Sequence, residues 1–299
     1  MDIARDLPPT RQVDGLVVLN KPAGITSARC LAPFKRQGQK KIGHAGTLDP
    51  MASGVLLVLL GQATKLSSWL MAGGRKIYSG IMELGITTDT WDAEGEIISR
   101  NTCGNVTTQD ISSAMEDWPR LCEQEVPAYS AAKHNGQPLY KIARKGHDVP
   151  VKVKKIEVFK ADLLEISLPY VHFRVECGSG TYVRSLAHSL GMRLGCGATL
   201  HKLTREYSHP FNLDQACGME AVQSGKWLQS VYPLTEAMPS WPRIELSASA
   251  VLDIRNGRPF HGVKGDDGDR AFLCHAGKPL AIARHEGAFW HIERGLRNT

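Results

Sequence analysis

GHAGTLDPMASGVL, residues 43–56, joins a glycine-containing loop, a single carboxylate at Asp49 and the beginning of an apolar run. No acidic residue lies between Asp14 and Asp49, whereas six lysines and arginines do. An aspartate that precedes proline is most often a solvated turn residue. A lone carboxylate in a basic, glycine-rich stretch instead suggests an anion held in place for chemistry on an anionic substrate. We therefore interpret Asp49 as a nucleophile.

The segments on both sides of this loop carry strand patterns. Residues 54–61 are apolar, rich in valine and leucine and bounded by glycines, which favours a buried central strand. Residues 15–20 predict a second short buried strand that ends in the turn 21–24. We expect Ser27 to cap a short helix, and a further helix over residues 63–71.

Strand and helix patterns are interleaved along the rest of the first 210 residues. Residues 75–84 and 95–100 predict strands, and alternating valine and lysine over 151–159 predicts a half-exposed strand with a basic outer face. Thr107 and Asp110 have the spacing of a capping box, which indicates a helix that reaches Trp118. The clearest helix spans residues 180–195, with an apolar stripe and Gly195 as a left-handed cap.

Prolines divide the chain near its carboxyl end. Pro233, Pro239 and Pro242 predict a linker, and the residues that follow combine short strand patterns with frequent glycine turn signals. We therefore predict two domains, a large one over residues 1–238 and a small β domain over 243–299.

The composition indicates an ordinary globular protein of 299 residues, 42% of them hydrophobic and 22% charged. The seven cysteines form no C-x-x-C pair and the histidines show no ligand spacing, so we expect neither a disulfide framework nor a metal site. Residues 1–9 lack an apolar signal core, and the uncharged run 50–64 is too short to span a bilayer. The expected location is the cytoplasm.

Positive charge is concentrated in one segment. Residues 132–160 hold eight lysines and arginines and two acidic residues. The net charge of this segment, +6, equals that of the whole chain. Such a concentrated patch favours RNA or a membrane surface over a diffuse excess of charge, although a solvated face remains the plainer alternative. Membrane binding is the weaker interpretation, because no amphipathic helix with aromatic anchors accompanies the patch.

Several stretches, in the same order and spacing, resemble the TruB family of pseudouridine synthases, which modify the T-loop of tRNA. The matching stretches are residues 43–56, the Lys-Pro pair at 21–22, RKIY at 75–78, VPAYSA at 126–131, GSGTYVR at 178–184 and the LGCGA to LTR region at 194–205. The resemblance covers most of residues 15–210. One departure is Ser179, which stands where the family often has lysine.

The resemblance implies an α+β pseudouridine synthase fold, with a mixed, mostly antiparallel sheet, flanking helices and a central basic cleft that contains Asp49. Residues 243–299 resemble a PUA-like RNA-binding domain. The implied reaction converts the T-loop uridine conventionally numbered 55 to pseudouridine. It is an isomerisation without redox change, so no cofactor is expected. The implied partner is the T-arm of tRNA, and we expect a monomer.

The resemblance also assigns roles to individual residues. Asp49 would attack either C1′ of the ribose or C6 of the base, and these two routes stay open. Arg184 would hold the carboxylate, and Tyr78 would stack on the flipped base and assist the proton step. The expected substrate-binding residues are His44, Lys21, Tyr182, Leu203, Lys133, Lys152 and Lys154.

Each of these residues also has an ordinary structural interpretation. Tyr78 alone would be a packing aromatic, Arg184 a surface ion-pair residue and Lys21 a surface lysine. A rival within the same class is a synthase that acts on ribosomal RNA, although those enzymes usually carry an H-R-L-D motif. The rival from another class is an RNA-binding protein or chaperone without catalytic activity, for which Asp49 would be dispensable.

Overall fold

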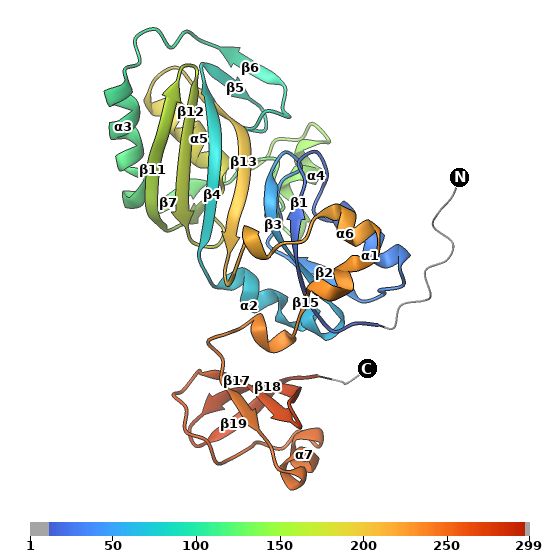
Figure 1. Ribbon diagram of the computed structural model, residues 1–299. Coiled ribbons are helices and arrows are strands. Elements are labelled where there is room, and N and C mark those ends of the chain that lie inside the picture. Colours follow the sequence, from blue (N-terminus) through green and yellow to red (C-terminus); the bar gives the residue numbers. More distant parts are fainter. Residues whose placement is uncertain (1–11, 297–299) are drawn as a thin grey trace, which may run out of the picture.

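The computed structural model describes residues 12–296, and a nine-stranded sheet forms its centre (Figure 1). The strand order is β11-β12-β4-β13-β3-β1-β15, with β2 added to β3 and β14 added to β13. Within the described residues the β13–β3 pair is parallel and the other pairs of this sheet are antiparallel. The strands are β1 (Gly15–Lys21), β2 (Ile42–Ala45), β3 (Ser53–Leu60), β4 (Lys76–Leu84), β11 (Val158–Ser167), β12 (Tyr170–Cys177), β13 (Ala198–Ser208), β14 (Phe211–Asn212) and β15 (Val231–Tyr232). The expected α+β fold with a mixed, mostly antiparallel sheet is confirmed.

Strand β3 is buried on both faces, which explains its continuous apolar sequence. Leu56, Val58 and Leu60 belong to one hydrophobic cluster, and the alternate residues of the strand belong to a second cluster on the opposite face. Gly54 has a φ of 101°, and a Cβ atom there would collide with the backbone of Arg205. A glycine at this position therefore permits β13 to approach β3.

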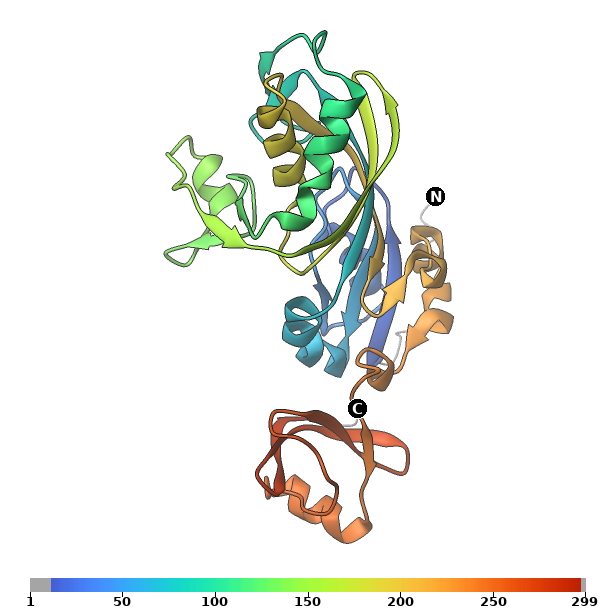
Figure 2. The same ribbon diagram turned by 90° about the vertical axis from the view of Figure 1, so that its left-hand side faces the viewer.

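Two helices cover one face of the β11–β13 half of the sheet (Figure 2). They are α3 (Thr108–Glu116) and α5 (Val183–Arg193). Thr107 and Asp110 form the predicted capping box, and Gly195 follows α5 with a φ of 74°. Both helix predictions are confirmed, except that α5 begins three residues later than expected, because residues 178–182 form its entry loop.

Three local predictions differ from the structure, wholly at Ser27 and in part at the other two. Ser27 caps no helix, because its hydroxyl exchanges hydrogen bonds with the backbone of Leu48. The helix expected over 63–71 is a 3-10 turn, η2 (Gly61–Leu66), followed by α2 (Ser67–Ala72). Residues 151–159 form parts of two strands, since β10 (Val153–Lys155) pairs with β7 (Glu123–Glu125) and Val158 begins β11.

The physical reason for the third error is the small size of the β10–β7 ribbon. A two-stranded ribbon has no opposing layer, so Val151 and Val153 remain 74% and 62% exposed. The predicted strand over 95–100 likewise belongs to a separate pair, β5 (Ile86–Thr88) with β6 (Ile97–Arg100). The remaining short elements are η1 (Arg29–Leu31), α1 (Ala32–Arg36), η3 (Trp118–Arg120), β8 (Lys133–His134), β9 (Gln137–Pro138), α4 (Leu139–Ala143), η4 (Leu213–Gln215), α6 (Met219–Gln223), η5 (Lys226–Ser230) and η6 (Leu234–Glu236).

The carboxyl-terminal region forms a second sheet of four strands below the first in Figure 1. Its elements are β16 (Arg243–Glu245), α7 (Ala248–Arg255), β17 (Arg270–His275), β18 (Lys278–Glu286) and β19 (Phe289–Gly295). The glycine turn signals gave no indication of α7. Phe272 and Ile282 of this sheet share a hydrophobic cluster with Leu66 and Leu70, so its inner face packs against the η2–α2 region.

The described residues include no helix long and apolar enough to cross a membrane. The residues from which no signal core was expected, 1–9, lie outside the described part of the chain, as do residues 10–11 and 297–299.

Candidate active site

Asp49 lies on the loop between β2 and β3, at a cleft of about 1200 Å³. Two contacts to other segments hold this loop. Ser27 binds both the backbone N–H and the carbonyl of Leu48, at 2.9 and 2.8 Å. Lys21, at the end of β1, donates from Nζ to the carbonyls of Pro50 and Ala52, at 3.1 and 2.6 Å. The loop is therefore anchored on either side of Asp49.

Lys21 is 0% exposed, so the interpretation as a surface lysine is wrong. Burial is the largest cause that lowers the pKa of its ammonium group, and the charge of Asp49 is among the influences that raise it again. A third carbonyl, that of Pro22, accepts from the same nitrogen at 3.0 Å. Two of its three recorded acceptors, the carbonyls of Pro50 and Ala52, belong to the loop that carries Asp49, so its geometry suits positioning of the loop.

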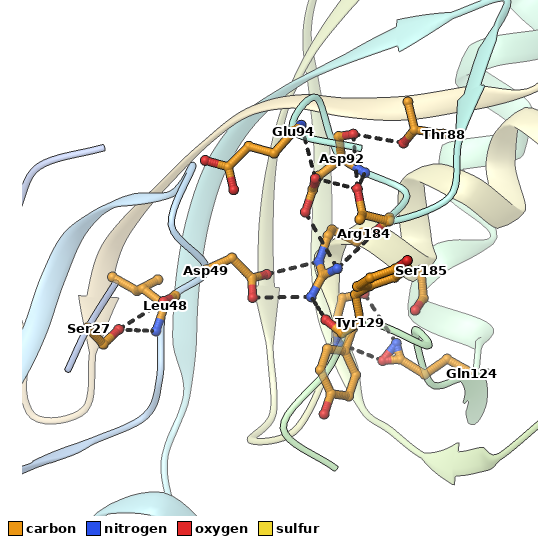
Figure 3. A network of polar contacts seen from close by, with 12 residues as sticks. Ser27, Leu48, Asp49, Thr88, Asp92, Glu94, Gln124, Tyr129, Arg184 and Ser185 are labelled. Carbon is orange, nitrogen blue, oxygen red and sulfur yellow. Dashed lines mark hydrogen bonds and ion pairs between the residues drawn. The ribbon is translucent and has the colours of Figure 1, made fainter. Parts of the chain in front are cut away.

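Arg184 on α5 faces Asp49 across the cleft (Figure 3). Its Nε lies 2.9 Å from Oδ2 of Asp49, and its Nη2 donates to Oδ1 at 3.1 Å. The planar guanidinium thus meets the carboxylate with two nitrogens, an arrangement that fixes the orientation of both groups. The side chain of Arg184 is 3% exposed and that of Asp49 is 33% exposed. The interpretation of Arg184 as a surface ion-pair residue is therefore wrong, while Asp49 remains accessible from the cleft.

Three further groups hold the Arg184 guanidinium (Figure 3). Nη1 donates to the carbonyl of Thr90 at 2.8 Å and lies 3.5 Å from Oδ2 of Asp92. Nη2 also donates to the carbonyl of Tyr129 at 3.1 Å. Burial raises the pKa of the Asp92 carboxyl, while a hydrogen bond from Thr90 and the charge of Arg184 act in the opposite direction. The arginine is thus fixed from the side opposite Asp49.

The loop that carries Thr90 and Asp92 packs on α5 through an aromatic pair. Trp91 has a φ of 60°, which is uncommon for a bulky residue. Its ring stacks on His188, with centroids 4.2 Å apart and planes inclined by 6°. Because His188 lies one helical turn after Arg184 on α5, this stack fixes the loop next to the arginine that it binds.

Tyr78 on β4 and Arg205 on β13 form another part of the cleft. Burial raises the pKa of the Tyr78 phenol, so the phenol is protonated at neutral pH. The charge of Arg205 and its hydrogen bond with the phenol oppose this rise. Arg205 is 1% exposed and donates to the carbonyls of Val55 and Gly46, each at 2.7 Å. The arginine therefore links Tyr78 to the loop that carries Asp49.

The other predicted contacts on the catalytic side also line the cleft, namely His44, Tyr182 and Leu203. Burial, and secondarily the charge of Arg205, lower the pKa of His44. Its buried Nδ1 has no hydrogen-bond partner among the described residues. The backbone of Tyr182 is bound on both sides by the Gln124 side chain, at 2.6 and 3.2 Å, which fixes the entry into α5.

The cleft is not basic, so that part of the fold prediction is wrong. Its lining holds five acidic residues (Asp49, Asp89, Asp92, Glu94 and Glu96) and five basic ones (Lys76, Arg144, Lys154, Arg184 and Arg205). Four of the five acidic residues, all except Asp49, come from the loop that fixes Arg184. Of the lysines predicted to bind substrate, Lys154 lines the cleft; Lys133 and Lys152 lie beside each other outside the lining, and Lys152 donates to the carbonyl of Lys133.

Sequence analysis missed several residues that build this site. Arg205 and Lys76 lay inside matching stretches but were assigned no role. Asp92 lies between the strands expected over 75–84 and 95–100 and was assigned no role. Gln124 carried no signal. In residues 12–296, no group of three or more His, Cys, Asp or Glu side chains has the arrangement of a metal site.

The chain is similar to proteins of one family over nearly its full length. A model described as TruB family pseudouridylate synthase (N terminal domain) matches residues 35–183. The tRNA pseudouridine synthase B of Oleidesulfovibrio alaskensis is 54% identical, and the match covers 96% of this chain and 98% of that protein. The protein of the same name from Syntrophus aciditrophicus is 40% identical, with 91% of each chain covered.

Two solved structures of complexes contain a chain with the same fold. A chain of a Cbf5-Nop10-Gar1 complex is 25% identical with a TM-score of 0.68, covering 94% of this chain and 84% of that one. A chain of an H/ACA RNP bound to a substrate RNA containing 2′-deoxyuridine is 23% identical with a TM-score of 0.67. That match covers 100% of this chain and 92% of the other, and it extends the likeness in fold through the carboxyl-terminal sheet.

Proposed function

The chain belongs to the TruB family of pseudouridylate synthases, and from this membership we propose that it converts uridine 55 in the T-loop of tRNA to pseudouridine. Relatives that carry the name tRNA pseudouridine synthase B over almost the whole chain support tRNA as the substrate. The single observation that carries the catalytic part of the proposal is the two-nitrogen pairing of Arg184 with an accessible Asp49 in the cleft.

The reaction breaks the N1–C1′ bond and forms a C1′–C5 bond within the same nucleotide. N1, which carries no proton in uridine, gains one in the product, and C5 loses one, so the isomerisation conserves protons overall. In our proposal Asp49 attacks as a nucleophile, at C1′ or at C6, and leaves again when the new bond is complete. Arg184 holds the carboxylate in a fixed orientation, because its Nη2 donates to Oδ1 and its Nε lies 2.9 Å from Oδ2.

Tyr78 is proposed to stack on the flipped uracil at the inner end of the cleft. Its phenol is protonated at neutral pH, so it would first transfer that proton to N1 of the freed base and then, as a phenolate, accept the C5 proton. The charge of Arg205 would stabilise the phenolate between these two transfers. His44, Tyr182 and Leu203 would form the walls around the displaced nucleotide.

The remaining assignments concern the partner and the location of the protein. We assign residues 1–238 as the catalytic domain and 243–299 as a PUA-like domain that contacts tRNA away from the reacting base. Lys133, Lys152 and Lys154 are assigned to the RNA backbone beside the T-arm, and Lys21 to the loop of Asp49. The protein would act as a cytoplasmic monomer, without a cofactor, since the isomerisation requires neither electrons nor energy input.

The proposal is tested with purified protein and an unmodified tRNA transcript in buffer that contains EDTA. One T-loop uridine should become pseudouridine, as located by carbodiimide treatment and primer extension. A T-arm stem-loop should react as well, and a hairpin of equal size and unrelated sequence should not. Modification of ribosomal RNA but not of tRNA would assign the protein to the rival substrate class. Binding without any modified uridine would favour an RNA chaperone.

A further inference from the structure

Lys76 on β4 is a buried cation without an acidic partner. It is 8% exposed, and its Nζ donates to the hydroxyl of Ser179 at 2.5 Å. Among the described residues no carboxylate forms an ion pair with it. Its pKa is lowered to about 8, chiefly by burial and also by the charges of Arg205 and Lys154. A buried charge without a counter-charge is costly in free energy, so its presence requires an explanation.

Two other cations and two glycines surround this ammonium group. Lys154 extends from β10 over Gly180, so that its Nζ occupies the space that a Cβ atom at residue 180 would need. On the opposite side, a Cβ at Gly46 would lie 3.3 Å from Nη1 of Arg205 and 3.8 Å from Cε of Lys76. The walls beside the cations are therefore bare backbone, and the three cations, together with both glycines, line the cleft.

We infer that Lys76, Lys154 and Arg205 form a binding subsite for one RNA phosphate, the phosphodiester adjacent to the flipped uridine. This inference rests on the proposed function, because it assumes an RNA strand in the cleft. A phosphate would supply the negative charge that the described residues around Lys76 lack. Glycine at positions 46 and 180 lets the Arg205 guanidinium and the Lys154 ammonium lie directly against the backbone, next to Lys76 in the cleft.

The position of the subsite determines which phosphate it binds. Lys76 and Tyr78 are two residues apart on β4, so their side chains point to the same face of the strand. Arg205 contacts both Tyr78 and the carbonyl of Gly46, on the loop of Asp49. A uracil stacked on Tyr78 would therefore have its own backbone linkage beside the cation cluster. The subsite would therefore contact the linkage next to the target uridine, whereas the lysines outside the cleft lining would contact other phosphates.

The first test measures binding of a T-arm stem-loop by proteins in an Asp49→Asn background, so that bound RNA is not converted. Lys76→Met should weaken binding at least about tenfold and lower the slope of log K against log salt by roughly 0.7. The matched control is Lys202→Met, since Lys202 is an exposed lysine on the same sheet outside the cleft lining. The control should stay within about twofold of the parent.

The second test identifies the phosphate. Stem-loops that carry a single neutral methylphosphonate linkage are scanned through the loop. At the linkage adjacent to the target uridine, Lys76→Met should have no further effect, because the charge that it contacts is already absent. At all remaining linkages, the fold-decrease in affinity caused by the methylphosphonate and that caused by Lys76→Met should multiply. Multiplying losses at all linkages, or full affinity of Lys76→Met, would overturn the inference.

Two further measurements separate this inference from damage to the fold and from the proposed function. Lys76→Met removes an uncompensated buried charge, so the free protein should melt at a higher temperature than the parent. Turnover by the protein with Asp49 intact is measured in parallel. If no uridine is converted but Lys76→Met loses its effect at the one linkage next to the target, the proposed function alone is refuted. If uridine is converted normally but Lys76→Met keeps its effect at all linkages, the subsite alone is refuted.

Discussion

Arg184→Lys tests the central pairing of the site, because it keeps a positive charge and removes the planar fork. In the structure, the guanidinium contacts both carboxylate oxygens of Asp49 and the carbonyls of Thr90 and Tyr129. A lysine offers one nitrogen in place of three, so it cannot reach all of these acceptors together. We expect it to keep one contact with Asp49 and to leave both carbonyls without a donor.

The size of the effect follows from these lost contacts. Each buried carbonyl without a partner costs about 1–3 kcal/mol, so the free energy of unfolding should fall by about 2–6 kcal/mol. Loss of one of the two charged contacts to Asp49 is worth about 1.5–3 kcal/mol. If that contact acts in the transition state, the barrier rises by the same amount and turnover falls about 10- to 100-fold.

The assay is single-turnover conversion of a T-arm stem-loop, with affinity measured separately. RNA affinity should change less than about threefold, because the Arg184 guanidinium is already engaged by Asp49, Asp92 and the carbonyls of Thr90 and Tyr129. Arg193→Lys is the control on the same helix, since Arg193 is 55% exposed and pairs with Asp117. If affinity falls while bound RNA is converted at the parent rate, Arg184 is a phosphate contact and the reasoning is refuted.

Three more predictions concern other groups of the site. Asp49→Asn should keep RNA affinity within a few fold and remove detectable turnover; residual activity within about tenfold, or ~1.4 kcal/mol, would contradict a nucleophile. Neutralising Lys152 and Lys154 together should lower the slope of log K against log salt by roughly 1.4 to 1.8, whereas an unchanged slope would mean a solvated face. Burial lowers the folded-state pKa of Lys76 to about 8, below its unfolded value of 10.5. The unfolded chain therefore binds more protons between these values, and parent stability relative to Lys76→Met should rise by up to ~3 kcal/mol from pH 8 to 10.5 in chemical denaturation.

The local pattern of the sequence was sufficient to predict the elements that depend on near neighbours. The sequence pattern alone predicts the continuous apolar strand β3, the capping box at Thr107 and the left-handed residue Gly195, and all three occur in the structure. Each is decided by contacts within a few residues or by burial on both faces. The error at 151–159 had the opposite cause, because alternation indicates burial only where a second layer exists, and the β10–β7 ribbon has none.

The partners in the site were decided by the tertiary structure. The sequence and its family resemblance pointed to Asp49, Tyr78 and Arg184. Nothing local indicated that Thr90, Asp92 and the carbonyl of Tyr129 would fix the arginine. These groups lie 55 to 94 residues away from Arg184 along the chain, so only the folding of separate segments against α5 brings them within hydrogen-bond distance.

The charge of the cleft shows the same division. The net charge of +6 and its concentration in residues 132–160 are properties of the sequence and indicate a polyanionic partner. They do not determine which charges face the cleft, where acidic and basic residues are equal in number. The uncompensated group around Lys76 arises because β4, β10 and β13 bring three cations together from distant positions, with no carboxylate recorded as a partner of Lys76 among the described residues. Composition reports the total charge of a chain, and only the packing of its strands determines where that charge lies.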